Sequence, residues 1–440
     1  MKDVKWIDNL KLRVGWGQTG NAGGIAGRST YALTAENTKH QFYDFGMGGG
    51  PNGSFHRVQG LYAPLVDPDL KWETNEQLNF GLDLGFLNND LTITLDYFTR
   101  KTKDLLIERQ IRPSAGNSSI YTNFGQINNY GFEFSVNYNK RLNKDWGINV
   151  AFNGSTLKNE IKKMGVDYTS TCGGSNSTYS AEDSMDGSNV GAVNGTGFLW
   201  NDHSICREGE AVGSYYGYRV AGVIKDEAML AQAKAQGQDK AQMGDFLFQD
   251  LDNNGKLDDN DRTILGDGLP SFNFGLNLSA TYKNWDFSIY SHGVFGMKIL
   301  SYSKMRMSIM NPSDDSWTPA LLEESYNNMW SPTNPGGSLA RLTRLDDNKN
   351  ARISDAWIVN GDYFKLSNIQ VGYNIPKPLL HTIGINAARV YFAVQNLFTI
   401  SGYTKYGDPE VGQGSVIYTG LDTGRYATPR TFQFGLNVTF

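Results

Sequence analysis

Twelve residues from Asp250 to Asp261 have the composition and the spacing of a calcium-binding loop. Oxygen-bearing side chains stand at positions 1, 3, 5, 9 and 12, a glycine at position 6, and Lys256, whose main-chain carbonyl would bind, at position 7. Calcium prefers such a set of oxygen ligands at this spacing. The six candidate ligands are Asp250, Asp252, Asn254, Lys256, Asp258 and Asp261.

Two features of this stretch leave an alternative open. Position 12 is an aspartate, Asp261, where a longer glutamate is usual, and a shorter side chain reaches the ion less easily with both oxygens. Asp, Asn and Gly also dominate tight turns that hold no ion. We expect Ca²⁺ in a structural role, because a single loop of this kind is more typical of a structural site than of a sensor.

No other pattern is typical of an active site. The five histidines, at positions 40, 56, 203, 292 and 381, are scattered without metal-ligand spacing, and no G-x-S-x-G motif occurs. The glycine-rich stretches at 20–24 and 46–50 do not open a helix after a strand, so they do not predict phosphate binding. We therefore expect a protein that is not an enzyme and has no catalytic residues.

The two cysteines, Cys172 and Cys206, lie in one long segment between predicted strands. If this segment is extracellular, a disulfide between them is the only intrachain pairing. Two free buried thiols are the alternative.

Aromatic residues in polar segments are candidates for ligand contacts, since their faces stack on sugar rings or hold peptides. Packing of the segments on their own aromatics explains each residue equally well. The candidates are Trp317, Trp330, Tyr403, Tyr406 and Tyr426.

The elements that position these residues are strands, because apolar residues alternate with polar ones through most of the chain. Ten such runs occur, and Phe364 and Leu366 are out of phase with Ile369 and Val371, which predicts a bulge. The only clear helical stretch is 226–236. The runs lie near residues 10–16, 78–86, 91–97, 132–138, 146–152, 272–282, 285–289, 363–373, 390–394 and 432–440.

The connections between these strands alternate between short and long. Turns at 87–90, 142–144, 283–284 and 374–387 are short, whereas the other connections span 18–74, 102–130, 156–270, 298–362 and 399–429. Short turns on one side and long loops on the other are typical of outer-membrane β-barrels. We predict an all-β, antiparallel, up-and-down transmembrane barrel segment of about ten strands with long extracellular loops.

Composition agrees with this architecture and excludes others. Fifty of 440 residues are glycine, 12% are aromatic, and the net charge of −5 argues against nucleic acid as a partner. The polar face of the strands is mostly Asn, Gly, Thr and Ser, the apolar face carries almost no charge, and the chain ends on Phe440 in a terminal amphipathic strand. Aromatics beside the short turns, such as Tyr138 with Trp146 and Tyr282 with Trp285, predict an interfacial girdle in contact with lipid.

Several stretches resemble the SusC/RagA-like family of TonB-dependent outer-membrane transporters. They include LKWETN from Leu70, DYFTRKTKDLL from Asp96, GQINNYGFEF from Gly125, GDFLFQDLDNNGKLDDNDRTILGDGLPSFNFG from Gly244, YFKLSNIQVGYNIP from Tyr363, RVYFAVQNLFTISGY from Arg389, GDPE from Gly407 and the PRTFQFGLNVTF terminus. The resemblance implies a plugged, 22-stranded barrel that imports glycan or peptide fragments. It also implies a SusD-like surface lipoprotein as a lid, TonB as the energy source, and a Bacteroidetes-like outer membrane as the location.

The resemblance also sets the expected domain organisation. Residues 1–440 align with the C-terminal part of such a barrel, and 156–270 form a long extracellular loop that carries the calcium-type motif. The plug, the TonB-contacting segment and the signal peptide are expected to be absent from this chain, whose own share in transport is therefore open.

Two other functions remain as alternatives. One is a complete small outer-membrane barrel that acts as an adhesin or a protease, and the other is a soluble, calcium-stabilised glycan-binding β protein. A barrel segment should leave the strands at 9–17 and 430–440 as open edges, whereas a complete small barrel should pair them.

Overall fold

A computed structural model describes residues 6–21, 42–45, 56–59, 67, 69–110, 119–123, 125–163, 170–171, 203–309, 320–343, 346–381, 384–412 and 419–440. Among these residues, no helix is both long enough and apolar enough to cross a membrane.

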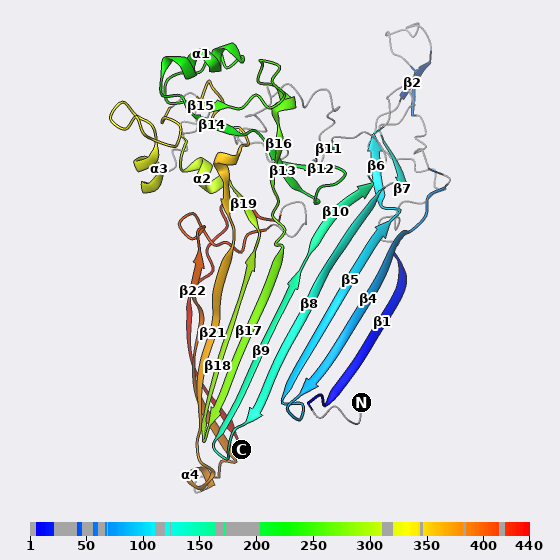
Figure 1. Ribbon diagram of the computed structural model, residues 1–440, viewed down its shortest axis with the longest axis vertical. Helices are drawn as coiled ribbons and strands as arrows, with labels where there is room; N and C mark the ends of the chain where they lie inside the picture. Colours follow the sequence, from blue (N-terminus) through cyan, green and yellow to red (C-terminus); the bar gives the residue numbers. More distant parts are fainter. Residues whose placement is uncertain are drawn as a thin grey trace.

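The main sheet is antiparallel, and its ten long strands follow one another in chain order (Figure 1). All ten predicted strands are confirmed. They are β1 (Asn9–Asn21), β4 (Glu73–Phe86), β5 (Leu91–Lys103), β8 (Gln126–Arg141), β9 (Trp146–Thr156), β17 (Phe272–Tyr282), β18 (Trp285–Phe295), β21 (Tyr363–Asn374), β22 (Ala387–Ser401) and β24 (Thr431–Thr439).

The short turns fall where the sequence predicts them. In the turn between β4 and β5, Asn88 and Asn89 have left-handed backbones with φ of 61° and 63°, which asparagine tolerates well. A five-residue helix, α4 (Lys377–His381), lies in the turn between β21 and β22. The predicted bulge is confirmed, because the pairing of β21 with both of its neighbours shifts between Leu366 and Asn368.

The two faces of the sheet separate as the alternation predicts. Leu82, Leu95 and Phe134 share one row of cross-strand pairs and therefore one face, while Thr94 and Ser135 pair in the next row, on the other face. Large apolar side chains of the outer face are exposed. Such exposure is expected where a sheet contacts lipid. Among these side chains are Leu12, Val14, Phe80, Phe287, Phe392, Phe434 and Leu436.

Aromatic rings mark both ends of this apolar face. At the turn end, Trp146 packs on Tyr282 with ring centroids 4.5 Å apart, and Trp285 packs on Tyr373 at 4.7 Å. At the loop end, a second belt consists of Phe134, Phe152, Phe272, Phe274, Phe295, Phe364 and Phe398.

The spacing of the two belts matches a membrane. On β17 the belts stand at positions 274 and 282. Eight residues at roughly 3.4 Å each, tilted by about 40°, span roughly 21 Å, close to the apolar band of about 25 Å in outer-membrane barrels. The predicted girdle is thus present at the turn end, with a second one at the loop end.

The sheet is open. Its order begins with β1 and ends with β24, and these two strands lie at opposite edges. The predicted open edges at 9–17 and 430–440 are therefore confirmed, which removes the structural basis for a complete small barrel.

The long connections between strands have secondary structure of their own, of which the sequence predicted only the helix at 226–236. Their elements gather at the loop end of the sheet (Figure 1). They are β2 (Phe42–Phe45), β3 (His56–Gln59), β6 (Leu106–Gln110), β7 (Ser119–Asn123), β10 (Lys158–Lys163), β11 (Ser170–Thr171), β12 (Ser204–Cys206), β13 (Ser214–Gly217), β14 (Val220–Val223), α1 (Glu227–Ala235), β15 (Phe246–Phe248), η2 (Asp259–Asp261), β16 (Thr263–Gly266), β19 (Lys298–Ser301), α2 (Tyr302–Arg306), α3 (Glu323–Asn328), η3 (Asp355–Trp357), β20 (Ile358–Asn360) and β23 (Leu421–Asp422).

We call the described residues of the ranges 203–271, 298–362 and 402–430 the loop assembly. Its core includes Phe246, Phe248, Leu300, Tyr302 and Trp357, all at most 2% exposed. The predicted helix is confirmed as α1, whose N-terminus is capped when the Asp226 carboxylate accepts a hydrogen bond from the Met229 amide. The loop assembly is thus a packed structure with an apolar core, which joins three connections that are far apart in sequence.

Candidate functional site

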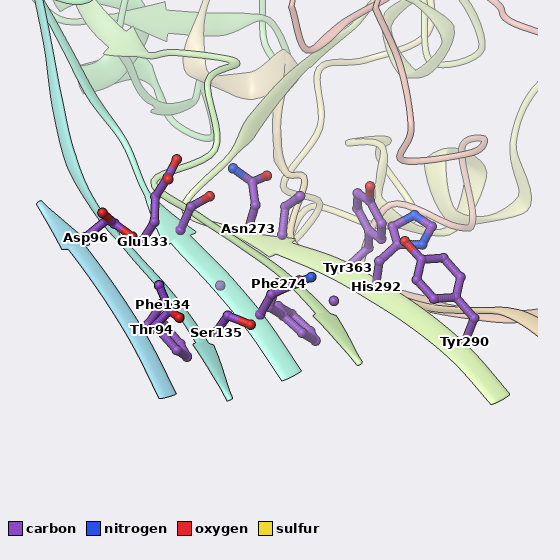
Figure 2. A pocket seen from close by; sticks show the side chains of 16 residues that line it. Thr94, Asp96, Glu133, Phe134, Ser135, Asn273, Phe274, Tyr290, His292 and Tyr363 are labelled. Carbon is purple, nitrogen blue, oxygen red and sulfur yellow. The ribbon is translucent and has the colours of Figure 1, made fainter. Parts of the chain in front are cut away.

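A hollow of about 540 Å³ lies on the concave face of the sheet, at its loop end (Figure 2). Two neighbouring rows of cross-strand pairs from β5 to β21 form most of its wall, because each inward side chain meets the next across the strands. One row holds Asp96, Glu133, Ser155, Asn273, Val294 and Tyr363, and the other holds Thr94, Ser135, Asn153, Gly275 and His292.

The acidic end of the hollow is formed by Asp96 and Glu133, which pair directly across β5 and β8. Two like charges in this position repel each other. Asp96 is compensated by Arg13, whose guanidinium lies 2.9 Å from Asp83 and 2.9 Å from Asp96. Glu133 is exposed to the hollow. The wall therefore offers one balanced and one solvated carboxylate.

Arg13 reaches Asp96 across an intervening strand, and a glycine makes this possible. A Cβ at Gly81 would lie 2.6 Å from the Arg13 guanidinium carbon and 2.5 Å from an Asp96 oxygen. The same arrangement recurs near the turn end. There the Arg389 side chain passes over Gly372 and forms an ion pair with Asp286 at 2.5 Å. Arginine, glycine and aspartate on three successive strands thus build ion pairs flat against the lumenal wall.

The other end of the hollow is aromatic, and we call Tyr290, His292 and Tyr363 the ring wall. The centroid of the His292 ring lies 5.9 Å from that of Tyr290 and 5.9 Å from that of Tyr363. The His292 and Tyr363 rings are nearly perpendicular. Figure 2 shows these three side chains together, across the hollow from Asp96 and Glu133. Such a surface binds by stacking and by contacts with ring edges.

A carboxylate from the last long connection holds the ring wall. Glu410 accepts hydrogen bonds on Oε1 from His292 Nε2 at 2.7 Å and from the Tyr363 hydroxyl at 3.3 Å, and on Oε2 from the Lys365 ammonium. The His292 hydrogen bond, together with Lys365, lowers the pKa of Glu410 to about 2, although burial acts in the opposite direction. Glu410 is therefore an anion at any physiological pH.

Lys365 is the counter-ion that makes this arrangement possible. Its side chain is only 3% exposed, and its ammonium lies 3.7 Å from Asp408 in addition to the contact with Glu410. A buried ammonium needs such partners, because an unpaired charge away from water is costly. Asp408 in turn accepts a hydrogen bond from the Thr428 hydroxyl.

Sequence reasoning did not single out Glu410, His292 or Lys365 as site residues. Glu410 and Asp408 belong to the GDPE motif, which the sequence marks only as one of several stretches that resemble a known family. One local signal was available, since Lys365 stands at an inward position of a predicted strand, next to the predicted bulge. A lysine there needs a carboxylate, but the sequence does not indicate which one.

The calcium-type loop lies in the loop assembly, away from the barrel strands. Carboxylate oxygens of Asp250, Asp252 and Asp261 come within 4.8 Å of one another. Asp261 is fully buried, and its oxygens accept hydrogen bonds from the amides of Leu251 and Asp258 at 2.7 and 2.8 Å. Three of the six predicted ligands are thus brought together, as a calcium site requires.

The remaining predicted ligands fit less directly. The Asn254 side-chain oxygen accepts from the Lys256 amide, and its nitrogen donates to Asp252 at 3.0 Å and to Asp258 at 3.3 Å. A cation between these carboxylates would take the place of that NH₂ group. Asp258 also caps η2 through the amide of Asn260. The donor set therefore suits Ca²⁺ if Asn254 turns, and calcium remains a prediction.

The predicted ligand-binding aromatics do not form one site. Trp330 is half-buried against the core of the loop assembly, and Tyr426 is 90% exposed. Trp317 lies outside the described residues. Tyr403 packs beside Tyr406 with ring centroids 5.7 Å apart.

The structure places Tyr403 in the core, which corrects its interpretation as a ligand contact. It is fully buried, and its hydroxyl contacts the Asp422 carboxylate and lies 2.7 Å from the Ser301 hydroxyl. Burial raises the pKa of this hydroxyl, so that it remains a donor. The ring therefore joins three segments of the loop assembly.

Cys206 is disulfide-bonded, whereas Cys172 lies outside the described residues. The pairing of the two cysteines remains a prediction.

A family model described as "TonB dependent receptor-like, beta-barrel" matches residues 3–397 of this chain. Two curated relatives match the whole chain. TonB-dependent receptor P3 of Formosa agariphila is 32% identical, and TonB-dependent receptor SusC of Bacteroides thetaiotaomicron is 30% identical. The chain spans 40% and 38% of the length of these relatives, or about two fifths.

Solved structures share the fold. The RagAB peptide importer in its open-open state superposes on the whole chain with a TM-score of 0.69 at 20% identity, and its closed-closed state with a TM-score of 0.68 at 21% identity. The chain covers 41% and 42% of those two chains.

Proposed function

Because the chain belongs to the TonB-dependent receptor-like β-barrel family of outer-membrane proteins, we propose that it forms part of the wall of a TonB-energised nutrient importer. In this role, its concave face lines the path of the solute. The hollow lies at the loop end of this path.

One observation carries this proposal: the two faces of the same sheet differ in what they can bind. The outer face ends in two aromatic belts and suits lipid. The hollow instead combines carboxylates, amides, hydroxyls and the ring wall. Such a mixture recognises polar solutes by hydrogen bonds and stacking. The activity that we propose is therefore binding and passage of a solute.

The solute class that we propose is glycan or peptide fragments. The resemblance to SusC/RagA-like transporters supports both, and one structural relative is by its title a peptide importer. A SusD-like surface lipoprotein as a lid and TonB as the energy source are proposed on the same ground.

We also propose that the loop at 250–261 holds a structural Ca²⁺. Asp250, Asp252 and Asp261 would supply carboxylate oxygens, and Asn254 and Asp258 would complete the shell. The ion would stabilise this part of the loop assembly.

A matched pair of asparagines on β17 tests the importer. Asn273 lines the hollow. Asn277 also points inward, but it lies outside the hollow, nearer to the turn end of β17. Each is changed to Ala in the longest open reading frame that contains this chain, expressed in a Bacteroidetes outer membrane. Uptake is measured with two fluorescein-labelled pools, one of maltodextrins and one of tryptic casein peptides.

We expect Asn273→Ala to lower the uptake of one pool several-fold, since it removes a hydrogen-bonding amide from the solute path. Asn277→Ala should leave uptake nearly unchanged. Equal uptake in wild type and both variants, with equal amounts of folded protein in the membrane, would contradict the assignment of the hollow to this path.

A further inference from the structure

We propose that Glu410 is the positioning residue of the hollow: it fixes His292 and Tyr363 so that their ring surfaces, and not their polar atoms, meet the solute. This inference rests on the proposed function for its consequence in transport. Its structural half, that Glu410 holds the ring wall, can be tested without any solute.

The first step is that the two strands alone do not fix these rings. His292 stands on β18 and Tyr363 on β21, where the pairing between the strands shifts beside the bulge at Leu366 and Asn368. Both residues lie within a few positions of the ends of their strands. Glu410 bridges both strands by accepting from both residues on the same oxygen.

The second step is that the polar atoms of the His292 and Tyr363 side chains are all engaged in hydrogen bonds. His292 Nε2 donates to Glu410, and Nδ1 lies 2.8 Å from the Ser367 hydroxyl, which donates to it. The Tyr363 hydroxyl also points to Glu410. With these atoms engaged, two of the three rings offer the hollow only their faces and C–H edges, and the ring wall becomes a stacking surface.

The third step is that Glu410 is itself held from behind. Lys365 and Asp408 anchor its segment on the wall, and the Arg425 guanidinium donates to the Glu410 carbonyl at 2.6 Å. On the apolar side, Tyr406 and Val411 pack against a small core that contains Tyr363 and the fully buried Tyr403. We call residues 402–412 the clasp segment, because they tie the last long connection to β18 and β21.

Charge decides whether a neutral residue could replace Glu410. A glutamine of the same shape has one acceptor oxygen and one NH₂ group. The buried Lys365 ammonium needs an acceptor, so the glutamine oxygen would turn toward it. The NH₂ group would then face the His292 and Tyr363 donors, which lose their shared acceptor. Glu410→Gln should therefore release the ring wall while it preserves the volume of the side chain.

The experiment compares Glu410→Gln with Glu76→Gln in the longest open reading frame that contains this chain, embedded in the outer membrane. Glu76 on β4 accepts hydrogen bonds from the Lys103 ammonium and from the Trp16 ring N–H, so its partners resemble those of Glu410. Among the described residues it contacts neither His292 nor Tyr363, and it is therefore the matched control. The first readout is the rate at which diethyl pyrocarbonate modifies His292, followed by mass spectrometry. The exposed His381 at the turn end is the internal reference.

We expect Glu410→Gln to raise the modification rate of His292 about tenfold, because it frees a ring nitrogen from a charge-assisted hydrogen bond. Glu76→Gln should change the rate less than about twofold, since the His292 contacts remain. An unchanged rate in Glu410→Gln would overturn the proposal. If this variant does not fold, Glu410→Asp serves instead, because it keeps the charge beside Lys365 but is too short to reach His292.

The second readout is uptake of the labelled maltodextrin and casein-peptide pools. A fall in uptake by Glu410→Gln that parallels the gain in His292 reactivity, at equal amounts of folded barrel, supports the proposal. Increased reactivity with unchanged uptake, while Asn273→Ala lowers uptake, would overturn it. If neither Asn273→Ala nor Tyr290→Ala changes uptake, the proposed function fails, and the His292 rate alone then decides whether Glu410 holds the ring wall.

Discussion

The transmembrane sheet and the loop assembly are stabilised in different ways. Strands of the sheet pair with neighbours in chain order, and their apolar side chains face outward, where lipid replaces a protein core. The loop assembly buries its apolar residues inward, and its parts come from three separate connections. The comparison teaches that one chain follows two opposite rules for apolar side chains, and that the surroundings of each region decide which rule holds.

The largest expected effect comes from the core of the loop assembly. Trp357 is 1% exposed and donates its ring N–H to the Arg352 carbonyl at 3.2 Å. Trp357→Ala should destabilise this region by about 3–5 kcal/mol, because it leaves a large cavity. Limited proteolysis of the loop assembly in urea measures the loss. Phe287→Ala on the lipid face is the control, and an equal loss there would show that the two regions do not differ.

A charge placed on either face of β17 sharpens the comparison within the sheet. Leu278 lies midway between the two aromatic belts on the outer face, and Asn277 points inward. Leu278→Lys should cost about 2–4 kcal/mol, as a lysine at the membrane midplane does. Asn277→Lys should cost far less, since its ammonium meets water. Folding into bilayers, followed by urea titration, measures both, and a similar cost for both would contradict the assignment of the faces.

Calcium should stabilise the loop assembly and leave the sheet unaffected. If Ca²⁺ binds at 250–261, an excess of 100 times the dissociation constant adds about 2.7 kcal/mol to the stability of the bound region. Removal of calcium by EGTA should therefore lower its melting temperature, and Asp252→Asn should abolish the effect. Asp226→Asn is the control, because asparagine also caps helices well and Asp226 lies at the start of α1. A calcium effect that survives Asp252→Asn would place the ion elsewhere.

The smallest expected effect is a loosening of the clasp segment in acid. The pKa of Glu410 falls from its ordinary value of 4.5 to about 2 in the folded protein. A depressed carboxylate pKa stabilises the folded state fully above the unfolded value, and this contribution is lost as the pH falls through the folded value. Hydrogen exchange at 402–412 should therefore show full protection near pH 5 and reduced protection near pH 2, after correction for intrinsic rates. Glu410→Gln should remove this dependence, and an identical dependence in that variant would contradict the assignment.

Much of the sheet was predictable, because strand alternation is a local property. Leu276 and Leu278 share a face whatever the rest of the chain does, since successive side chains of a strand point to opposite sides. The phase change between Leu366 and Ile369 predicted the bulge by the same logic, and the asparagines at 88–89 predicted a tight turn. The acidic spacing at 250–261 likewise predicted carboxylates that converge within one loop.

The hollow and the clasp segment were decided by the tertiary structure alone. Asp96 meets Glu133 only because β5 pairs with β8 in one particular register, and Glu410 reaches His292 across 118 positions of sequence. Tyr403 shows the same limit of prediction. Whether a tyrosine in a polar segment is buried or exposed depends on which segments fold over it. Local spacing determines which face a side chain takes, whereas its partners depend on which distant segments the fold brings together, and no periodicity along the chain encodes that choice.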